Sequence, residues 1–231
     1  MQTSRQRARS EEDKARRREA LLDAAYEVAA RTSVRDLTLA QVTRAAGLDP
    51  SGLRRYFSSR EELLLDLAEA RGVAWAERLC TELSDGRRRT REELAHTLTS
   101  TLTADPVLCD LLVHVPLSLE DGVDIERARR FKTEGFRAQH AMSRAIADAS
   151  DEIGVPEART VLAATAALAG NLWQLSHPAP TLAALYEQVP EWGHVALNFE
   201  PSLEYMLNVV LLGLTAPGSP EPPDWIGPAS A

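Results

Sequence analysis

Two adjacent arginines, Arg54 and Arg55, precede Tyr56 and Phe57 in the stretch TLAQVTRAAGLDPSGLRRYFSSREELL, which begins at Thr38. An arginine guanidinium donates paired hydrogen bonds to a guanine edge or clamps a phosphate, so the pair suits the binding of nucleic acid. The sequence has no nucleophile grouped with a base and an orienting residue, no glycine-rich phosphate loop and no cluster with metal-ligand spacing. We therefore expect binding chemistry at this stretch, and no enzymatic activity, cofactor or metal.

Helix-start signals surround the arginine pair. Thr38 is a typical N-cap for a short helix that Gly47 ends, and Asp49 caps the next helix, which we expect to reach Phe57. Ser59 lies at the start of a third helix. Two short helices separated only by Gly-Leu-Asp must cross at a steep angle, which is the geometry of a helix-turn-helix.

The outward face of the second helix supplies the candidate DNA-binding residues. Leu53 and Phe57 are four residues apart and are expected to face inward. A duplex major groove admits one helix, whose exposed side chains read base edges while flanking polar groups hold phosphates. A merely solvated arginine face is the alternative. The candidates are Thr38, Thr43, Arg44, Ser51, Gly52, Arg54, Arg55, Tyr56 and Arg60.

The charge is divided unevenly along the chain. Through Arg60 there are 13 Lys+Arg against 8 Asp+Glu, whereas the remainder has 13 against 26 within a total formal charge of -8. A basic front on an acidic body indicates a polyanion-binding module joined to a part that does not touch the polyanion, although an asymmetry of solvated charge would look the same. Residues 1–10 are expected to form a disordered basic arm that adds phosphate contacts.

The composition and periodicity predict an all-α protein. With 231 residues and 44% hydrophobic residues, the chain can build a sizeable core, and it shows no sustained period-two alternation. We expect a DNA-binding domain over residues 11–60 with its motif at 38–57, a helical domain over 61–214, and a Pro-rich tail over 215–231 in which Trp225 is the one large anchor. No apolar run suits a membrane helix or a signal peptide, so we expect a cytoplasmic protein. We expect Cys80 and Cys109 to act as small buried hydrophobic residues.

The first part of the chain resembles the TetR family of transcriptional regulators. The family's N-terminal module carries a pattern close to T-x-x-x-I-A-x-x-A-G-V-S-x-G-T-L-Y-Y-H-F-x-S-K-E-x-L, and the similarity covers Glu19 to about Ala68. Identical or closely substituted positions are Thr38, Val42, Ala46, Gly47, Leu48, Asp49, Leu53, Phe57, Ser59, Arg60, Glu61 and Leu63.

The chain departs from this pattern at the residues most relevant to DNA. Arg54 and Arg55 replace two tyrosines, of which one commonly grips phosphate in the family, and Tyr56 replaces a histidine. Which of the three residues grips phosphate and which reads bases is left open. The departures imply an operator unlike the better-known ones.

The resemblance implies a ligand-binding and dimerisation domain after about Glu69, with a four-helix bundle across a two-fold axis. Two apolar helices, at 156–175 and 201–214, agree with this in outline, because such wide apolar faces are buried on several sides or shared with a partner. An ordinary monomer core is the alternative. The expected dimerisation residues are Leu162, Thr165, Leu168, Leu172, Leu203, Met206, Leu207, Val210 and Leu214.

Large or polar residues on the helices of this domain are candidates for lining a ligand pocket. The expected function is that of a homodimeric regulator, a repressor of a palindromic double-stranded DNA operator, released by an unknown small-molecule effector. The alternative is a DNA-tethered protein-interaction regulator with no metabolite pocket. The candidate ligand residues are Trp75, His96, His114, Phe131, Phe136, His140, Met142 and Trp173.

Overall fold

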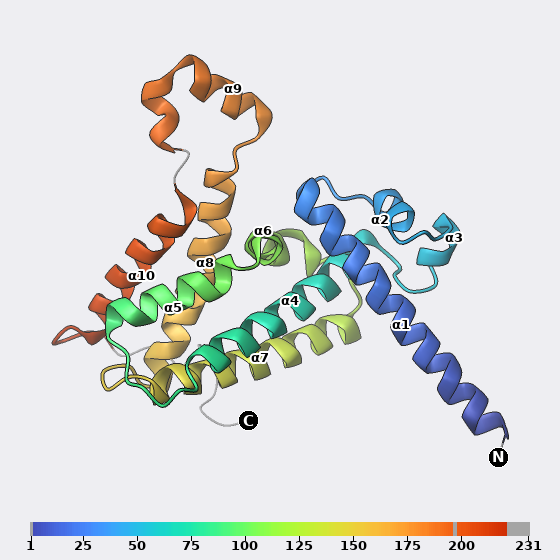
Figure 1. Cartoon of the computed structure of the whole chain (residues 1–231), viewed down its shortest axis with the longest axis horizontal. Helices are drawn as coiled ribbons and strands as arrows, with labels where there is room; N and C mark the ends of the chain where they lie inside the picture. The colour runs from blue at the N-terminus through green and yellow to red at the C-terminus, as the bar shows by residue number, and fades with distance from the viewer. Residues whose placement is uncertain (1, 196–197, 221–231) are drawn as a thin grey trace. The chain divides into compact units, whose positions relative to one another are not determined.

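The computed structural model describes residues 2–195 and 198–220, with side chains from residue 13 onward except at 50–51 and 194–195. Every regular element in this described part is helical, which confirms the all-α prediction (Figure 1). Trp225 and the end of the predicted tail lie outside it. The elements are α1 (Gln2–Arg31), α2 (Leu39–Ala45), α3 (Pro50–Leu53), α4 (Arg60–Glu82), α5 (Arg91–Thr103), α6 (Pro106–His114), η1 (Val115–Leu119), α7 (Ile125–Asp148), α8 (Val155–Ser176), α9 (Pro180–Gln188), η2 (Pro190–Val195) and α10 (Phe199–Thr215).

The first helix is longer than expected. It starts at Gln2, whereas the sequence predicted a disordered arm over residues 1–10 and a helix start at Ser10. Between Gln2 and Arg31 there is no proline or glycine, and arginine, glutamate, glutamine and alanine are all good helix formers. The capping signal at Ser10 is therefore overridden by an uninterrupted helical sequence.

The chain divides into two compact units at positions other than the predicted boundary at Arg60. The first unit comprises Met1–Ala70 and His114–Phe131, and the second comprises Arg71–Val113 and Lys132–Ala231. The start of α4, up to Ala70, belongs to the first unit with the helix-turn-helix, and its side chains Leu63, Leu64 and Leu67 are buried. The start of α7 joins them through ion pairs from Arg127 to Asp66 and Glu69. Both long helices continue into the second unit.

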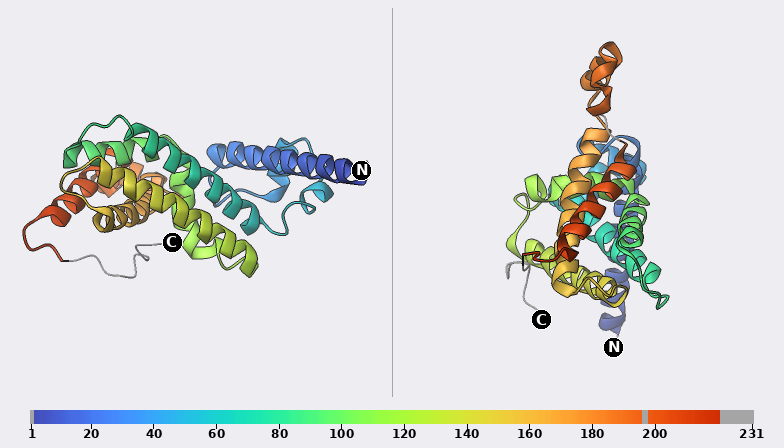
Figure 2. Two further views of the ribbon diagram at one scale, coloured as in Figure 1. Left: turned by 90° about the horizontal axis from the view of Figure 1, so that it is seen from below. Right: turned by 90° about the vertical axis from the view of Figure 1, so that its left-hand side faces the viewer.

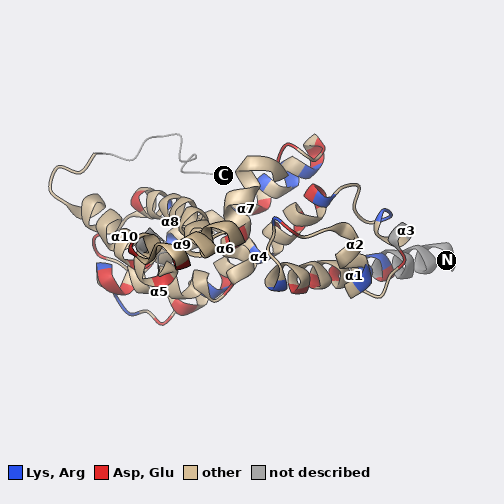
Figure 3. Ribbon diagram, turned by 90° about the horizontal axis from the view of Figure 1, so that it is seen from above, with Lys and Arg blue, Asp and Glu red and all other residues tan. Residues whose placement is uncertain are grey.

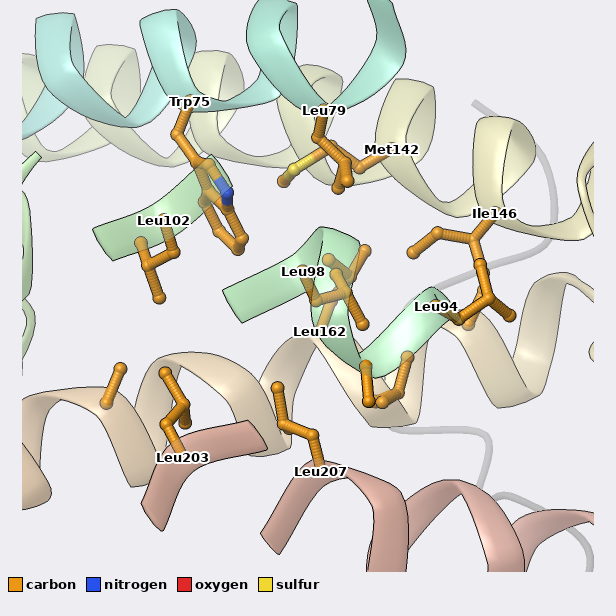
Figure 4. Packing of buried hydrophobic residues seen from close by; sticks show 14 of the residues in the cluster. Trp75, Leu79, Leu94, Leu98, Leu102, Met142, Ile146, Leu162, Leu203 and Leu207 are labelled. Atoms are coloured by element: carbon orange, nitrogen blue, oxygen red, sulfur yellow. The ribbon is translucent and has the colours of Figure 1, made fainter. Parts of the chain in front are cut away.

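The core of the second unit lies among α4, α5, α7, α8 and α10 (Figure 4). Trp75 and Leu79 of α4 approach Leu98 of α5 from one side, and Leu203 and Leu207 of α10 lie on the opposite side. α10 packs against both α8 and α5. Within the described residues no single helix is long and apolar enough to cross a membrane, and only α5 together with α6 and η1, across a 90° bend, meets that test.

The connection between α8 and α10 carries the short helix that the sequence predicted at 181–187. α9 and η2 pack on each other and project from the ends of α8 and α10 (Figures 1 and 2). None of the α9 residues is buried, and Leu182 and Trp192 are exposed.

Candidate nucleic-acid interface

Local sequence signals define both ends of α2, the first helix of the helix-turn-helix. Thr38 and Gln41 form a capping box, in which the Gln41 amide donates to the Thr38 hydroxyl at 3.3 Å and the Thr38 amide donates to the Gln41 side-chain oxygen at 2.7 Å. Gly47 then adopts φ +65°, a left-handed conformation that disfavours side chains and lets the chain turn. The capping box and the Gly47 turn together set where α2 begins and where the chain turns toward α3.

The segment from Pro50 to Phe57 is a short helix followed by turns rather than the continuous helix predicted. α3 ends at Leu53, and the amide of Tyr56 donates to the Leu53 carbonyl at 2.8 Å, a tighter i to i+3 bond. The Phe57 amide shares the same acceptor at 3.0 Å. Gly52, a poor helix former by roughly 1 kcal/mol relative to alanine, contributes to this early end.

Burial separates the two faces of the segment. Leu53 and Phe57 are each only 1% exposed, as predicted, while Arg54 and Arg55 are exposed. Neither arginine has an ion-pair partner among the described residues. A Cβ at Gly52 would meet only Leu48 Cβ at 4.0 Å, so internal packing within the unit does not demand a glycine there. Tyr56 is half-buried, and the side chain of Ser51 lies outside the described residues.

Two predicted DNA contacts are corrected by the structure. Thr43 is buried, and its hydroxyl donates to the Ala40 carbonyl at 3.1 Å. The Arg60 guanidinium donates to the carbonyls of Leu37 at 2.7 Å and Val34 at 2.6 Å, so it braces the loop before α2 instead of facing outward. Thr43 serves a carbonyl of its own helix, as threonine often does, whereas the acceptors of Arg60 lie more than twenty residues away in the sequence.

Arg44 keeps an exposed position on α2. It lines a surface groove of about 270 Å³ together with Val28, Arg31, Thr32, Gln41 and Ala45. Thr38 is also exposed, although its hydroxyl serves the α2 cap.

Arg18 is a site residue that was not among the DNA-binding candidates predicted from the sequence. Its guanidinium donates to the carbonyl of Tyr56 at 2.6 Å and lies over the Phe57 ring, 4.2 Å from the centroid. The available signal was its position about one turn before the buried residue Leu21 and two turns before the buried residue Ala25, on the same face of α1. An arginine that continues an apolar stripe is a candidate for an internal contact.

Glu62 completes the start of α4. Its carboxylate accepts from the amide and the hydroxyl of Ser58 at 2.7 and 2.6 Å. Burial alone would raise the pKa of Glu62, but these hydrogen bonds, helped by the charges of Arg18 and Arg127, outweigh it and lower the pKa.

The candidate ligand residues differ widely in burial, and three of them, Trp75, Met142 and Trp173, belong to or pack against the core of the second unit. The prediction is corrected for His96, Phe136 and His140, because their side chains are exposed to solvent. His96 also contacts Glu204 at 3.1 Å. Trp75 is a core residue whose indole donates to Thr101 at 3.2 Å. Of the other candidates, His114 and Phe131 are half-buried, Met142 is buried, and Trp173 stacks on His177. Among the described residues no group of metal-ligating side chains is found.

The expected dimerisation face is also corrected in part. Leu162, Thr165, Leu172, Leu203 and Leu207 are buried within one chain and cannot meet a partner. Leu168, Met206, Val210 and Leu214 are partly buried and pack against that same core.

A different apolar face on α10 is open. Tyr205, Val209 and Leu212 are 70%, 52% and 55% exposed and share one side of the helix. Neither α8 from Thr160 onward nor α10 from Tyr205 onward carries an acidic or basic residue, and Figure 3 shows little charge on either helix.

A capped helix, a glycine turn and a second short helix form a helix-turn-helix, a motif of DNA-binding proteins. Residues 21–67 match the family described as bacterial regulatory proteins, tetR family, and residues 69–218 match the tetracyclin repressor-like C-terminal domain. The chain belongs to the TetR family of DNA-binding transcriptional regulators.

Solved structures of other regulators share the fold. A TetR transcriptional regulator from Rhodococcus sp. RHA1 is 14% identical with a TM-score of 0.53, covering 87% of this chain and 95% of that one. The fatty acid degradation regulator FadR from Bacillus halodurans is 14% identical with a TM-score of 0.52, covering 84% and 97%. The multidrug binding protein EbrR complexed with imidazole is 17% identical with a TM-score of 0.51, covering 87% and 96%. No curated protein gives a match.

Proposed function

We propose that the protein is a homodimeric repressor that binds an inverted-repeat operator in double-stranded DNA and leaves it when a small molecule binds the second unit. The exposed arginine pair between buried Leu53 and Phe57 carries this proposal. The buried residues fix the segment on the protein, and the arginines extend from it with no internal ion pair among the described residues. Arginine in this setting reads guanine edges or grips phosphate.

The residues proposed to contact DNA are fewer than the sequence suggested. Arg54 and Arg55 are the central pair, with Tyr56 beside them and Arg44 and Thr38 on α2. Gly52 supports close approach of the backbone to the duplex, because packing inside the unit leaves room for a side chain there.

The dimer is proposed to form through the outer face of α10, with α8 beside it. Tyr205, Val209 and Leu212 place large apolar side chains in solvent on a helix whose opposite side is already buried. An uncharged, apolar face of this kind is typical of a subunit interface. A two-fold dimer would present two arginine pairs to half-sites about one helical turn of DNA apart.

Control by a small molecule is proposed from family membership. Among the similar structures, EbrR is described as a multidrug binding protein and FadR as a fatty acid degradation regulator. For modest control, the effector must bind the DNA-incompatible arrangement better by about 1 to 3 kcal/mol. We propose that the protein acts in the cytoplasm, with no enzymatic role and no cofactor.

Selection from a pool of random-sequence duplexes tests the proposal. Purified protein is expected to enrich an inverted repeat, because two identical heads related by a two-fold axis read the same half-site twice. Enrichment of a single unrepeated site would contradict the dimeric reader, and enrichment of no sequence would contradict sequence-specific binding altogether. A small molecule that lowers the occupancy of the enriched duplex would support the ligand-controlled repressor. It would argue against the alternative, a DNA-tethered regulator that interacts with a protein and has no metabolite pocket.

A further inference from the structure

A cluster of charged side chains, centred on the buried residues Asp66 and Arg127, joins three helices of the first unit. It consists of Arg18 on α1, Glu62, Asp66 and Glu69 on α4, and Arg127 and Arg130 on α7. Three guanidinium groups face three carboxylates, so the formal charge of the cluster is balanced. We refer to it as the Asp66 cluster, because the Asp66 carboxylate is the acceptor that α1 and α7 share.

The two oxygens of Asp66 are divided between the helices. One oxygen accepts from Arg127 Nε at 2.5 Å and from Arg130 at 3.2 Å, and the other accepts from Arg18. Asp66 and Arg127 are both buried. Arg127 donates further to Glu69 at 2.9 Å. Both oxygens of the Asp66 carboxylate are satisfied, which offsets the cost of burying its charge, whereas Arg127 Nη2 is buried with no hydrogen-bond partner among the described residues.

Arg18 connects this carboxylate to the DNA-facing segment. One guanidinium nitrogen donates to the Tyr56 carbonyl at 2.6 Å, a second meets Asp66, and the guanidinium group lies 4.2 Å from the centre of the Phe57 ring. Carbonyls at the end of a helical segment lack an internal partner, and a cation there is favourable. The contact falls on the residue directly after the Arg54–Arg55 pair.

We propose that Arg18 is a positioning residue for DNA binding, which sets the orientation of the Arg54–Arg55 segment and ties it through Asp66 to Arg127 and Arg130 of α7. The inference rests on the proposed DNA-binding function. Arg18 is only partly exposed and its guanidinium is engaged within the protein, so it acts on DNA through the segment it holds and does not grip phosphate itself.

An Arg18→Met variant tests this role on the duplex enriched by the wild-type protein. Methionine keeps an apolar stem over Phe57 but donates no hydrogen bond. We expect affinity for that duplex to fall by about tenfold, the usual worth of a hydrogen bond involving a charged group, with an unchanged slope of log affinity against log salt. Arg17→Met is the matched control, because Arg17 is the exposed neighbour on the same helix. An unchanged affinity, or a salt slope reduced by about 1, would overturn the positioning role.

A lysine at the same position separates geometry from charge. An ammonium group cannot serve the carbonyl, the carboxylate and the ring at once as a planar guanidinium does. We therefore expect Arg18→Lys to bind more weakly than the wild-type protein. Full affinity in the lysine variant would show that positive charge alone suffices and would contradict the proposal.

The link to α7 is tested with Arg130→Met, because Arg130 is the more exposed of the two α7 arginines and its loss leaves the buried Arg127 pair in place. Arg18 and Arg130 donate to the same carboxylate, so the loss of affinity in the double variant should be smaller than the product of the single losses. Strictly multiplicative losses would show that Asp66 does not couple the two helices.

Amide hydrogen exchange tests, in the absence of DNA, whether Arg18 holds the Arg54–Arg55 segment in place. The amides of Tyr56 and Phe57 both donate to the Leu53 carbonyl, so their exchange reports how firmly the segment is held. Arg18→Met should speed their exchange while Arg17→Met leaves it unchanged. If the wild-type protein enriches no duplex, the proposed function fails, but exchange still decides whether Arg18 holds the segment; equal exchange in all three proteins would refute that role.

Discussion

The guanidinium of Arg60 donates a 2.7 Å hydrogen bond to the carbonyl of Leu37, the residue immediately before the Thr38 cap of α2. It also reaches the carbonyls of Val34 and Arg35. One side chain at the start of α4 therefore braces the loop that leads into the helix-turn-helix.

Arg60→Met should destabilise the protein by about 2 kcal/mol, because carbonyls of the Val34–Leu37 loop lose a charged donor. The free energy of unfolding from a urea titration measures the effect. Arg35→Met is the control, since its exposed ion pair to Asp36 at 3.7 Å should contribute less than about 0.5 kcal/mol. Equal effects of the two substitutions would contradict the bracing role of Arg60.

Ser58→Ala should reduce stability in a pH-dependent way. The pKa of Glu62 is lowered in the folded protein, so its contribution is present above its unfolded pKa of about 4.5 and is lost as the pH falls through the folded value. Removal of the hydroxyl should cost about 1 kcal/mol at about pH 7, and the difference from the wild type should shrink toward about pH 3. Urea titrations at both pH values measure it, with Ser84→Ala as a control at a serine that has no carboxylate partner among the described residues. A constant difference at both pH values would exclude the Glu62 carboxylate as the cause.

The two cysteines should resist thiol reagents in the folded protein. Burial, aided by the nearby Asp105 charge, raises the pKa of Cys109 to about 12, and burial also raises the pKa of Cys80. Because the thiolate is the reactive form, a chromogenic disulfide reagent at about pH 8 should leave Cys109 unmodified and react only slowly with Cys80 until denaturant is added. Rapid labelling of Cys109 under native conditions would show that its surroundings are open.

Val209→Asp should convert the proposed dimer to a monomer without unfolding it. The side chain is 52% exposed in one chain, so a carboxylate there is solvated in the monomer but would be desolvated in an apolar interface. Sedimentation velocity gives the oligomeric state. Phe136→Asp, at another exposed apolar residue on a different helix, should leave the dimer intact. A dimeric Val209→Asp protein would locate the interface elsewhere.

The local signals of the helix-turn-helix could be predicted from the sequence. The Thr38 cap, the Gly47 turn and the inward Leu53 and Phe57 all depend on short-range rules of capping and periodicity, and the structure confirms them. The engagement of Arg60 could not be predicted in this way, since its acceptors lie more than twenty residues away and are backbone carbonyls.

The two sides of an apolar helix could not be assigned from the sequence either. Leu203 and Leu207 satisfy the same apolar pattern as Val209, but only the packing of α10 on α8 and α5 shows which residues fill the chain's own core. Periodicity identifies an apolar face without identifying what covers it. The predicted ligand residues met the same difficulty, because size and polarity do not show whether a side chain such as Phe136 points inward.

The most direct measurement is the affinity of an Arg54→Ala, Arg55→Ala double variant for the duplex enriched by the wild-type protein, followed across salt concentrations. We expect a loss on the order of a hundredfold with retained stability, because an arginine that contacts a base edge contributes about 1 to 3 kcal/mol. An Arg87→Ala, Arg137→Ala variant removes the same charge from exposed residues of the second unit and should bind as the wild type does. If the Arg54, Arg55 variant binds the same duplex as tightly as the wild type, the arginine pair is not the DNA-contacting group and the account is wrong.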